Sequence, residues 1–333
     1  MPEREPTDIC GREGLPQLRL KGACRLRVLL VIPVAFLMLF FSAGISAASK
    51  VSFSSGQALN DPISASLDLV LRTPTTTWRS PLIEVYRWDV FPHVLVIDTA
   101  DFQIQDRMFT RLAYFVEKKG YQGRLMTNAQ LAGRHGWNAH DYGPDGLAAF
   151  FNAASAQAFS LNPEETALEA LSLREGILVA AGNEVAAGNG GVIALSRSSS
   201  DIERKYLLTH ESFHGIFFSS PDYRQFCFDL WDSLPSGERD FYTSFLDGLG
   251  YDGGDRFLAV NEFQAYLMQQ PLSYARSYFQ RFFALFAEQG ASTNQLADDL
   301  LETAKRLDVY LQRTFEIKAG QTIHPTAQGG QGG

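Results

Sequence analysis

The stretch KYLLTHESFHGIFF, residues 205–218, determines how the rest of this chain is interpreted. Its apolar side chains surround His210, Glu211 and His214, which together spell HExxH. Residues four positions apart share a helix face, so both imidazoles can bind one Zn²⁺ while Glu211 lies beside it as a general base. Burying these polar groups without a partner would be costly. The stretch therefore predicts a buried helix that supplies two zinc ligands.

The same residues have a second interpretation. His210 and His214 could be hydrogen-bonded core histidines, with Glu211 as a surface carboxylate. A catalytic zinc ion usually has three protein ligands and one open position. The zinc interpretation therefore requires a third ligand elsewhere in the chain.

Patterns that extend HExxH differ in this third ligand. In HExxHxxGxxH it is a histidine, but Phe217 stands at the glycine position and Ser220 at the histidine position. The segment GLGYDGGDRF, residues 248–257, does not match the pattern that supplies an aspartate. The segment AVNEFQAYLMQQP, residues 259–271, is apolar and helical in pattern, and contains an Asn-Glu pair at Asn261 and Glu262.

With HExxH and this Asn-Glu pair, the chain resembles the gluzincins, the thermolysin-like superfamily of zinc peptidases, over residues 202–270. The resemblance implies Glu262 as the third zinc ligand. The alternative for Glu262 is an exposed carboxylate in the first turn of a helix. In thermolysin-like enzymes an aspartate four residues further on orients a zinc-bound histidine, whereas this chain has Tyr266 there. Tyr266 could donate its hydroxyl to a ligand or to an oxyanion, or it could be a core aromatic residue.

Hydrolysis at such a site would use zinc to polarise the scissile carbonyl and Glu211 to carry the proton. A donor must also stabilise the developing oxyanion. Four tyrosines are near in sequence, and the sequence leaves the choice open among Tyr251, Tyr266, Tyr274 and Tyr278.

Two segments before the HExxH helix are candidates for contacts with substrate. Residues 177–183 and 191–199 are apolar runs on either side of a glycine-rich turn, which predicts a β-hairpin. Gluzincins often present an edge strand to extended peptides, so the resemblance implies backbone contacts from residues 192–196, with Val192 and Ala194 as substrate-binding residues. The alternative is an ordinary sheet strand. In the glycine-rich loop 133–146, His140 is a candidate proton donor or substrate contact, with an ordinary loop histidine as the alternative.

The hydrophobic pattern predicts an α+β fold. The run VLVIDT, residues 94–99, reads as a buried strand, residues 104–120 as a helix and residues 121–127 as a second strand, which together would form a β-α-β unit. After residue 200 the pattern is mostly helical. We therefore expect an α/β front domain, residues 49–200, whose sheet edge strand packs on a helical zinc-binding domain, residues 201–318.

The two ends of the chain differ from this pattern. Basic residues precede an uncharged run, residues 28–49, which begins with apolar residues and ends with the small residues GISAAS, with a cleavage site after Ala47 or Ala48. Residues 1–48 are therefore predicted to be a signal peptide or a membrane anchor, and the protein to be exported: periplasmic, secreted or anchored on the outer side. Residues 319–333 are predicted to be a disordered tail.

Composition limits the classes of partner. The net charge is −8, and no dense cluster of Lys and Arg occurs after residue 50, so nucleic-acid binding is not expected. The sequence predicts an exported zinc metallopeptidase that acts on a peptide or protein substrate. Two alternatives stay open: a non-catalytic periplasmic or surface binding protein that keeps the fold, and a zinc hydrolase of a non-peptide amide.

Overall fold

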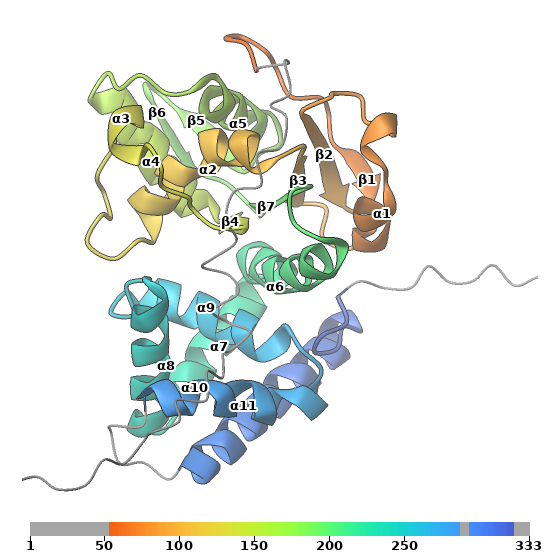
Figure 1. The fold of residues 1–333 in the computed structure, drawn as a ribbon, viewed down its shortest axis with the longest axis vertical. Helices are drawn as coiled ribbons and strands as arrows, with labels where there is room; N and C mark the ends of the chain where they lie inside the picture. Colours follow the sequence, from red (N-terminus) through yellow and green to blue (C-terminus); the bar gives the residue numbers. More distant parts are fainter. Residues whose placement is uncertain (1–52, 287–292, 323–333) are drawn as a thin grey trace, which may run out of the picture. The chain divides into compact units, whose positions relative to one another are not determined.

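The computed structural model describes residues 53–286 and 293–322, and only the backbone of residues 282–286 and 293 (Figure 1). The predicted signal peptide or membrane anchor, residues 1–48, and its uncharged run, residues 28–49, lie outside the described residues. The chain from residue 323 onward also lies outside them. Among the helices of the described ranges, none combines the length and hydropathy needed to cross a membrane.

The front part, residues 53–200, is built on one mixed five-stranded sheet, which confirms the α+β class. In sheet order the strands are β1 (Ile63–Ala65), β2 (Ile83–Trp88), β3 (Val94–Thr99), β7 (Gly191–Ser196) and β4 (Ala139–Tyr142). β1 pairs parallel with β2 and β3 with β7, whereas the β2–β3 and β7–β4 pairs are antiparallel. All residues of β3 and β7 are buried, as their apolar sequences require for interior strands.

One face of this sheet is covered by front-part helices and a small second sheet. The helices of the front part are α1 (Leu67–Arg72), the 3₁₀ turn η2 (Thr75–Thr77), α2 (Phe102–Val116), α3 (Asn128–Leu131), α4 (Pro144–Ala156) and α5 (Pro163–Arg174). α2, α4 and α5 contribute buried apolar side chains to a core that they share with β3 and β7. The second sheet pairs β5 (Leu178–Ala181) with β6 (Glu184–Ala187).

Two predicted elements of the front part were wrong. The hairpin partner of residues 178–181 is β6, because the chain already turns back at Gly182, and β7 joins the large sheet instead. Residues 121–127 form turns and no strand, so the predicted β-α-β unit does not close there. The parallel neighbour of β3 is β7, which comes much later in the chain.

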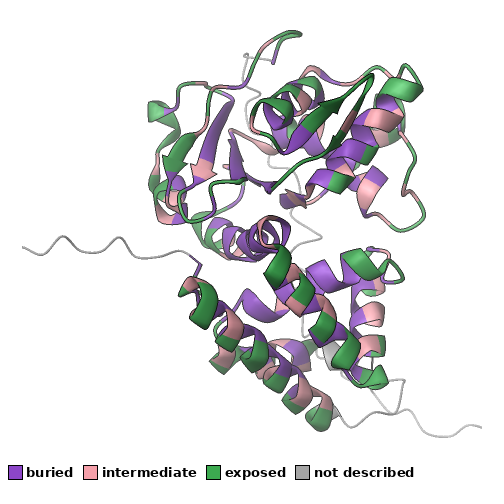
Figure 2. Ribbon diagram, turned by 180° about the vertical axis from the view of Figure 1, so that it is seen from behind, coloured by how far each residue is buried: buried purple, intermediate pink, exposed green. Residues whose placement is uncertain are grey.

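The back part, residues 201–322, is helical in its described residues, as predicted. It consists of α6 (Asp201–Ser219), α7 (Pro221–Ser233), α8 (Ser236–Leu249), α9 (Arg256–Met268), α10 (Leu272–Phe286) and α11 (Thr293–Phe315). α6 packs on β7, β3 and β4 on one side and contacts α7 and α9 on the other. It is therefore buried along most of its length (Figure 2).

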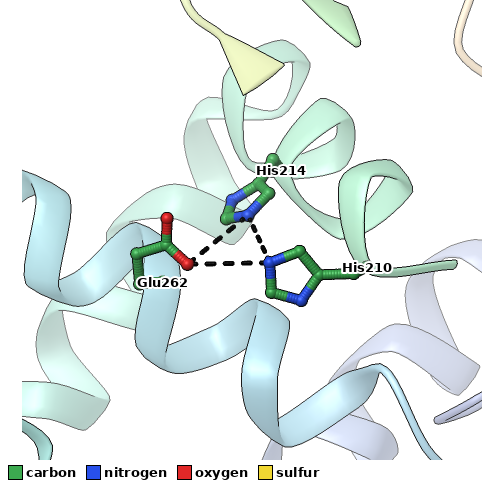
Figure 3. A group of neighbouring side chains, drawn as sticks. All are labelled: His210, His214 and Glu262. Carbon is green, nitrogen blue, oxygen red and sulfur yellow. Dashed lines mark hydrogen bonds and ion pairs between the residues drawn. The ribbon is translucent and has the colours of Figure 1, made fainter. Parts of the chain in front are cut away.

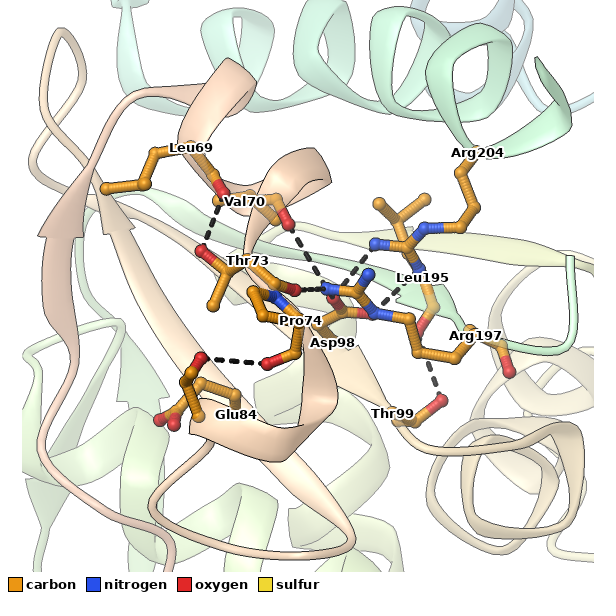
Figure 4. A network of polar contacts seen from close by, with 12 residues as sticks. Leu69, Val70, Thr73, Pro74, Glu84, Asp98, Thr99, Leu195, Arg197 and Arg204 are labelled. Carbon is orange, nitrogen blue, oxygen red and sulfur yellow. Dashed lines mark hydrogen bonds and ion pairs between the residues drawn. The ribbon is translucent and has the colours of Figure 1, made fainter. Parts of the chain in front are cut away.

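The beginning of α6 is fixed to the sheet by a buried ion pair (Figure 4). Arg204 donates two hydrogen bonds to Asp98 on β3, with N–O distances of 2.8 and 2.9 Å. Arg197 also lies 2.6 Å from the Asp98 carboxylate and donates to the carbonyl oxygens of Val70 and Thr73. A buried carboxylate with this many charged donors holds its partners in one geometry.

The end of the back part corrects the predicted tail boundary. Residues 319–322, assigned to a disordered tail by sequence, are packed: Ala319 donates its backbone N–H to Asp308 at 2.7 Å, and Gly320 donates to the Met268 carbonyl at 2.7 Å. Ala319 and Thr322 are buried. The low complexity that suggested disorder begins beyond these residues.

Candidate metal centre

The HExxH residues lie on α6, as the sequence predicts. Ser200 caps the helix by accepting from the Glu203 N–H, and the Glu203 carboxylate accepts in return from the Ser200 N–H. His210, Glu211 and His214 are 8%, 5% and 0% exposed. The alternative of a surface carboxylate at Glu211 is therefore not what the structure shows.

The Asn-Glu pair lies in the second turn of α9 and faces α6. Asp255 caps this helix, and nearly all residues of α9 from Leu258 onward are buried. Glu262 is 1% exposed, so the alternative of an exposed carboxylate at the helix start is also excluded. The contact between α9 and α6 brings Glu262 to the two histidines.

The three predicted ligands converge on one point (Figure 3). The two Nε2 atoms of His210 and His214 are 3.1 Å apart, and Glu262 Oε2 lies 3.6 Å from the first and 3.8 Å from the second. Ligands about 2.0–2.1 Å from a tetrahedral zinc ion are about 3.3 Å from one another. Among the described residues, Glu262 Oε2 has no hydrogen-bond partner. This donor set and spacing fit a zinc ion.

Each histidine has a polar neighbour at its other ring nitrogen. His210 Nδ1 lies 2.9 Å from Gln269 Oε1; because an amide oxygen only accepts, Nδ1 carries the proton and Nε2 keeps its lone pair toward Glu262. His214 Nδ1 lies 3.5 Å from Asp141 Oδ2. Asn261 donates to the same Asp141 oxygen at 3.0 Å and so holds the carboxylate in place.

Asp141 is a site residue that sequence reasoning did not single out. Its neighbour His140 is the predicted proton donor or substrate contact, and the structure places the two side chains on opposite faces of β4. Successive residues of a strand point to opposite faces, so on β4 Asp141 faces α6 and α9 while His140 and Tyr142 face α2. His140 is 1% exposed, stacks on Phe109 and contacts the Tyr142 hydroxyl at 3.0 Å. The signal was present in the alternation of residues 139–142, which had been assigned to a loop.

The predicted backbone contacts at Val192 and Ala194 were wrong. β7 is an interior strand: its two edges are paired with β3 and β4, and both side chains are 0% exposed. An extended substrate cannot add to a strand whose backbone is already paired on both sides. The strand at the sheet edge beside the site is β4.

Glu211 lies where a general base is needed. Ligand atoms of Glu211, Asp141 and His214 all lie within 4.8 Å of one another. Among the described residues, Glu211 Oε2 has no hydrogen-bond partner. Burial raises the pKa of Glu211 well above its ordinary value, and the nearby charges of Asp141 and Glu262 add to this effect. Without a metal the site therefore favours the protonated form of Glu211, whereas a nearby divalent cation would favour the ionised form that can accept a proton.

The predicted tyrosines separate into two kinds. Tyr266 packs its ring edge-to-face on His210, with centroids 4.7 Å apart, and the Tyr251 side chain lies beside Glu262. Tyr274 is 62% exposed, and Tyr278 bonds with Tyr206 and Gln269. Tyr251 and Tyr266 are therefore the tyrosines in contact with predicted ligands.

Glu117 and Lys118, at the end of α2, also belong to the site and were missed by sequence. Ligand atoms of Glu117, Asp141 and Glu262 lie within 4.8 Å of one another, and Trp137 Nε1 donates to Glu117 at 3.0 Å. Burial raises the pKa of Glu117, whereas burial lowers the pKa of Lys118 to about 8. No motif marks residues 117–118, because their proximity to Glu262 arises only from the tertiary fold.

The protonation states suit cation binding. Burial lowers the pKa of His210 to about 4, so its ring is neutral near pH 7 and can act as a ligand. Burial raises the pKa of Glu262 to about 8. Four buried or nearly buried carboxylates, those of Glu117, Asp141, Glu211 and Glu262, therefore share one small volume. A divalent cation would offset their mutual repulsion.

Comparison with protein-family models, curated proteins and solved structures found no match to this chain. The assignment of the site therefore depends on its geometry.

Proposed function

We propose that this chain is an exported zinc-dependent hydrolase that cleaves amide bonds in peptides or proteins. The observation that supports it most is the convergence of His210, His214 and Glu262, whose ligand atoms are 3.1–3.8 Å apart. These are the distances expected between neighbouring ligands of one tetrahedral zinc ion. Export would be directed by residues 28–49.

The roles of the residues follow from their positions. A zinc ion held by His210, His214 and Glu262 would supply the Lewis acidity that polarises the scissile carbonyl. Glu211 takes a proton from the attacking water and later gives it to the leaving amine. Its raised pKa favours holding that proton between the two steps. The hydroxyls of Tyr251 and Tyr266 are the available donors to the developing oxyanion.

For a peptide substrate, β4 is the strand that an extended chain would join. In the described part of the chain β4 pairs only with β7, and its Asp141 side chain already reaches His214. A substrate strand added to β4 would therefore run close to the predicted ligands. This replaces residues 192–196 as the proposed contact.

A second candidate is a hydrolase of a small non-peptide amide. It is favoured by the burial of the site, because His210, Glu211, His214 and Glu262 are each no more than 8% exposed. A closed site suits a small substrate better than a long groove does. Assaying the purified protein on unstructured peptides and on small acylated amines in parallel distinguishes the two.

The first experiment is the zinc content of the purified full chain by elemental analysis. We expect one zinc per chain in the wild type, and its loss in His214→Ala and Glu262→Ala. His135→Ala is the matched control, because His135 is a surface histidine bound to Asp106 and should leave the zinc content unchanged. A wild type without zinc, after incubation with the metal, would remove the basis of the proposal.

A second variant separates catalysis from metal binding. Glu211→Gln should keep one zinc per chain but lose activity by about 10²–10⁴-fold, because the general base is removed while the ligands stay. Loss of zinc in this variant would show that Glu211 is a ligand and not the base. Zinc binding without turnover on any substrate would favour a non-catalytic binding protein.

A further inference from the structure

A turn of the front part lies beside the candidate metal centre and contacts the back part. This turn, residues 117–123, follows α2, and we call it the strap. It meets residues 247–253, which are the end of α8 and the start of the loop that leads to α9; these residues are called its loop below. Two backbone contacts join them: an antiparallel β-bridge between Lys118 and Tyr251, and a hydrogen bond from the Lys119 N–H to the Gly250 carbonyl at 3.1 Å. Two side-chain contacts add to these: an ion pair of Lys119 with Asp247 at 2.7 Å, and a hydrogen bond from Gln122 to Asp252 at 3.1 Å.

The inner side of the strap faces the predicted ligands. Glu117, the first residue of the strap, has a ligand atom within 4.8 Å of one of Glu262, and Trp137 stacks on Tyr251 with ring centroids 4.9 Å apart. Lys118 Nζ lies over the same Trp137 ring, 2.8 Å from its centroid. The residues that join the strap to the loop are thus adjacent to the site.

The predicted ligands are almost entirely buried. His214 and Glu262 are 0% and 1% exposed, His210 is 8% exposed, and Tyr251 is 7% exposed. A catalytic metal centre must admit both water and substrate to its open position. Wider access for a substrate would therefore require a contact around the site to separate.

The contacts around the site differ in strength. α6 is fixed to the sheet by Arg204 and Asp98, which are buried and share two hydrogen bonds. In the strap, Lys119 and Asp247 are 51% and 36% exposed, and an exposed ion pair contributes little net stability. The ion pair of the strap is therefore weaker than the one that fixes α6 to the sheet.

We propose that the strap is the gate of the site, and that its separation from residues 247–253 admits substrate and metal. The proposal rests on the proposed function, since it concerns access to the same site. When the strap separates from its loop, water hydrates the polar groups that had contacted one another. The stacked rings of Trp137 and Tyr251 then become exposed. Such hinge-like opening of a loop is a common step in enzymes.

The test joins the strap to its loop. Cysteines are introduced as Gln122→Cys and Asp252→Cys in the full chain. Cys10→Ser and Cys24→Ser remove two native cysteines, and the third, Cys227, is buried and is kept. A short cross-linker that reacts with two thiols then links the strap to the loop. The two single-cysteine variants, treated with the same reagent, are the controls.

The first readout is the rate at which zinc-loaded protein loses zinc to excess chelator. We expect the linked protein to lose zinc at least tenfold more slowly than the controls. Equal rates, with one zinc per chain in all samples, would overturn the gate while leaving the zinc site intact. The zinc content itself reports separately on the proposed function.

The second readout needs no metal. Diethyl pyrocarbonate modifies accessible histidines, and mass spectrometry measures the rate at His210 and His214. The linked protein should be modified at least tenfold more slowly at these two residues, with His135 unchanged. Equal rates at His210 and His214 would overturn the proposal even if the protein bound no zinc.

A single variant gives an independent check. Lys119→Ala removes the ion pair of the strap and should speed zinc loss and histidine modification by only a few-fold, because an exposed ion pair contributes little net stability. Lys305→Ala is the matched control, because Lys305 forms an ion pair of similar exposure with Glu302 on α11. The same rates in both variants would contradict the gate.

Discussion

At the residue scale, Asp141 on β4 supplies a carboxylate beside a histidine, which α9 does not supply. Tyr266 stands where thermolysin-like enzymes have an aspartate that orients a histidine, and in this protein Tyr266 packs on His210 instead. Asp141 reaches His214 from β4, on another part of the chain. The orienting carboxylate can therefore be supplied from the sheet.

This arrangement predicts the effect of Asp141→Asn. The variant keeps the shape of the side chain but loses the charge that favours a proton on His214 Nδ1, so zinc affinity should fall by about 10–100-fold. A competition titration with a chelator of known affinity measures this. Asp145→Asn, an exposed aspartate four residues away, should have no effect. Unchanged affinity in Asp141→Asn would show that Asp141 does not orient the ligand.

The raised pKa of Glu262 predicts how zinc binding depends on pH. Burial raises this pKa to about 8, and the proton must leave when the carboxylate binds the metal. Zinc affinity should therefore rise by roughly tenfold per pH unit below about pH 8 and level off above it. Titrations one pH unit apart test this. A flat profile would mean that Glu262 binds no metal or is already ionised.

The same group predicts a trend in metal-free stability. The folded state holds a proton that the unfolded chain, with the ordinary pKa of 4.5, has released, so the free energy of unfolding falls as pH rises from about 4.5 to about 8. Glu117 and Glu211, whose pKa values burial also raises, act in the same direction. Urea unfolding should show a weaker pH trend in Glu262→Gln than in the wild type.

At the scale of elements, α6 sits close to the sheet because Gly215 has no side chain. A Cβ added at Gly215 would lie 2.9 Å from Val94 Cγ1 on β3. Gly215→Ala should therefore destabilise the fold by about 1–3 kcal/mol, as expected for overpacking. Urea unfolding measures the change.

A double variant and a control make this prediction specific. Val94→Ala removes the clashing methyls and should make a further Gly215→Ala change much less destabilising. Gly237→Ala, on α8, has nothing within 4 Å of the added Cβ and should be neutral or slightly stabilising. A similar loss in both glycine variants would point to backbone effects instead of packing.

The elements that sequence predicted correctly are those whose pattern depends on their own residues. The helix around His210 and the strand 94–99 were predicted because apolar spacing reports burial directly. The order of strands was not, because Val192 is equally apolar in an edge strand or an interior strand. Likewise, glycines around residues 139–142 suggested a loop, while pairing with β7 makes the segment a strand. The order of strands and the strand at residues 139–142 both depend on which strands lie next to each other in the fold.

At the scale of the whole molecule, the site is assembled from separate parts of the chain. The two histidines come from α6, Glu262 from α9 and Asp141 from the sheet. The spacing of HExxH predicted the first pair, and the resemblance implied Glu262. The strap residues Glu117 and Lys118 could not be predicted, because only the folded chain brings them near α9.

This assembly predicts that zinc stabilises the folded protein. Because the ligands meet only in the folded state, zinc at 1,000 times its dissociation constant should add about 4 kcal/mol to the free energy of unfolding. Thermal unfolding with and without zinc measures the shift. Glu262→Ala should show little of it, and an equal shift in that variant would place the stabilising metal elsewhere.

The Asn261–Asp141 hydrogen bond, described above as holding a carboxylate in place, also has a consequence during synthesis. Asp141 leaves the ribosome long before Asn261 and Glu262. A nascent or truncated chain that ends before α9 therefore carries the HExxH histidines without a third ligand and without the contact that fixes Asp141. Zinc would then be retained only by chains long enough to contain α9 and to pack it against α6.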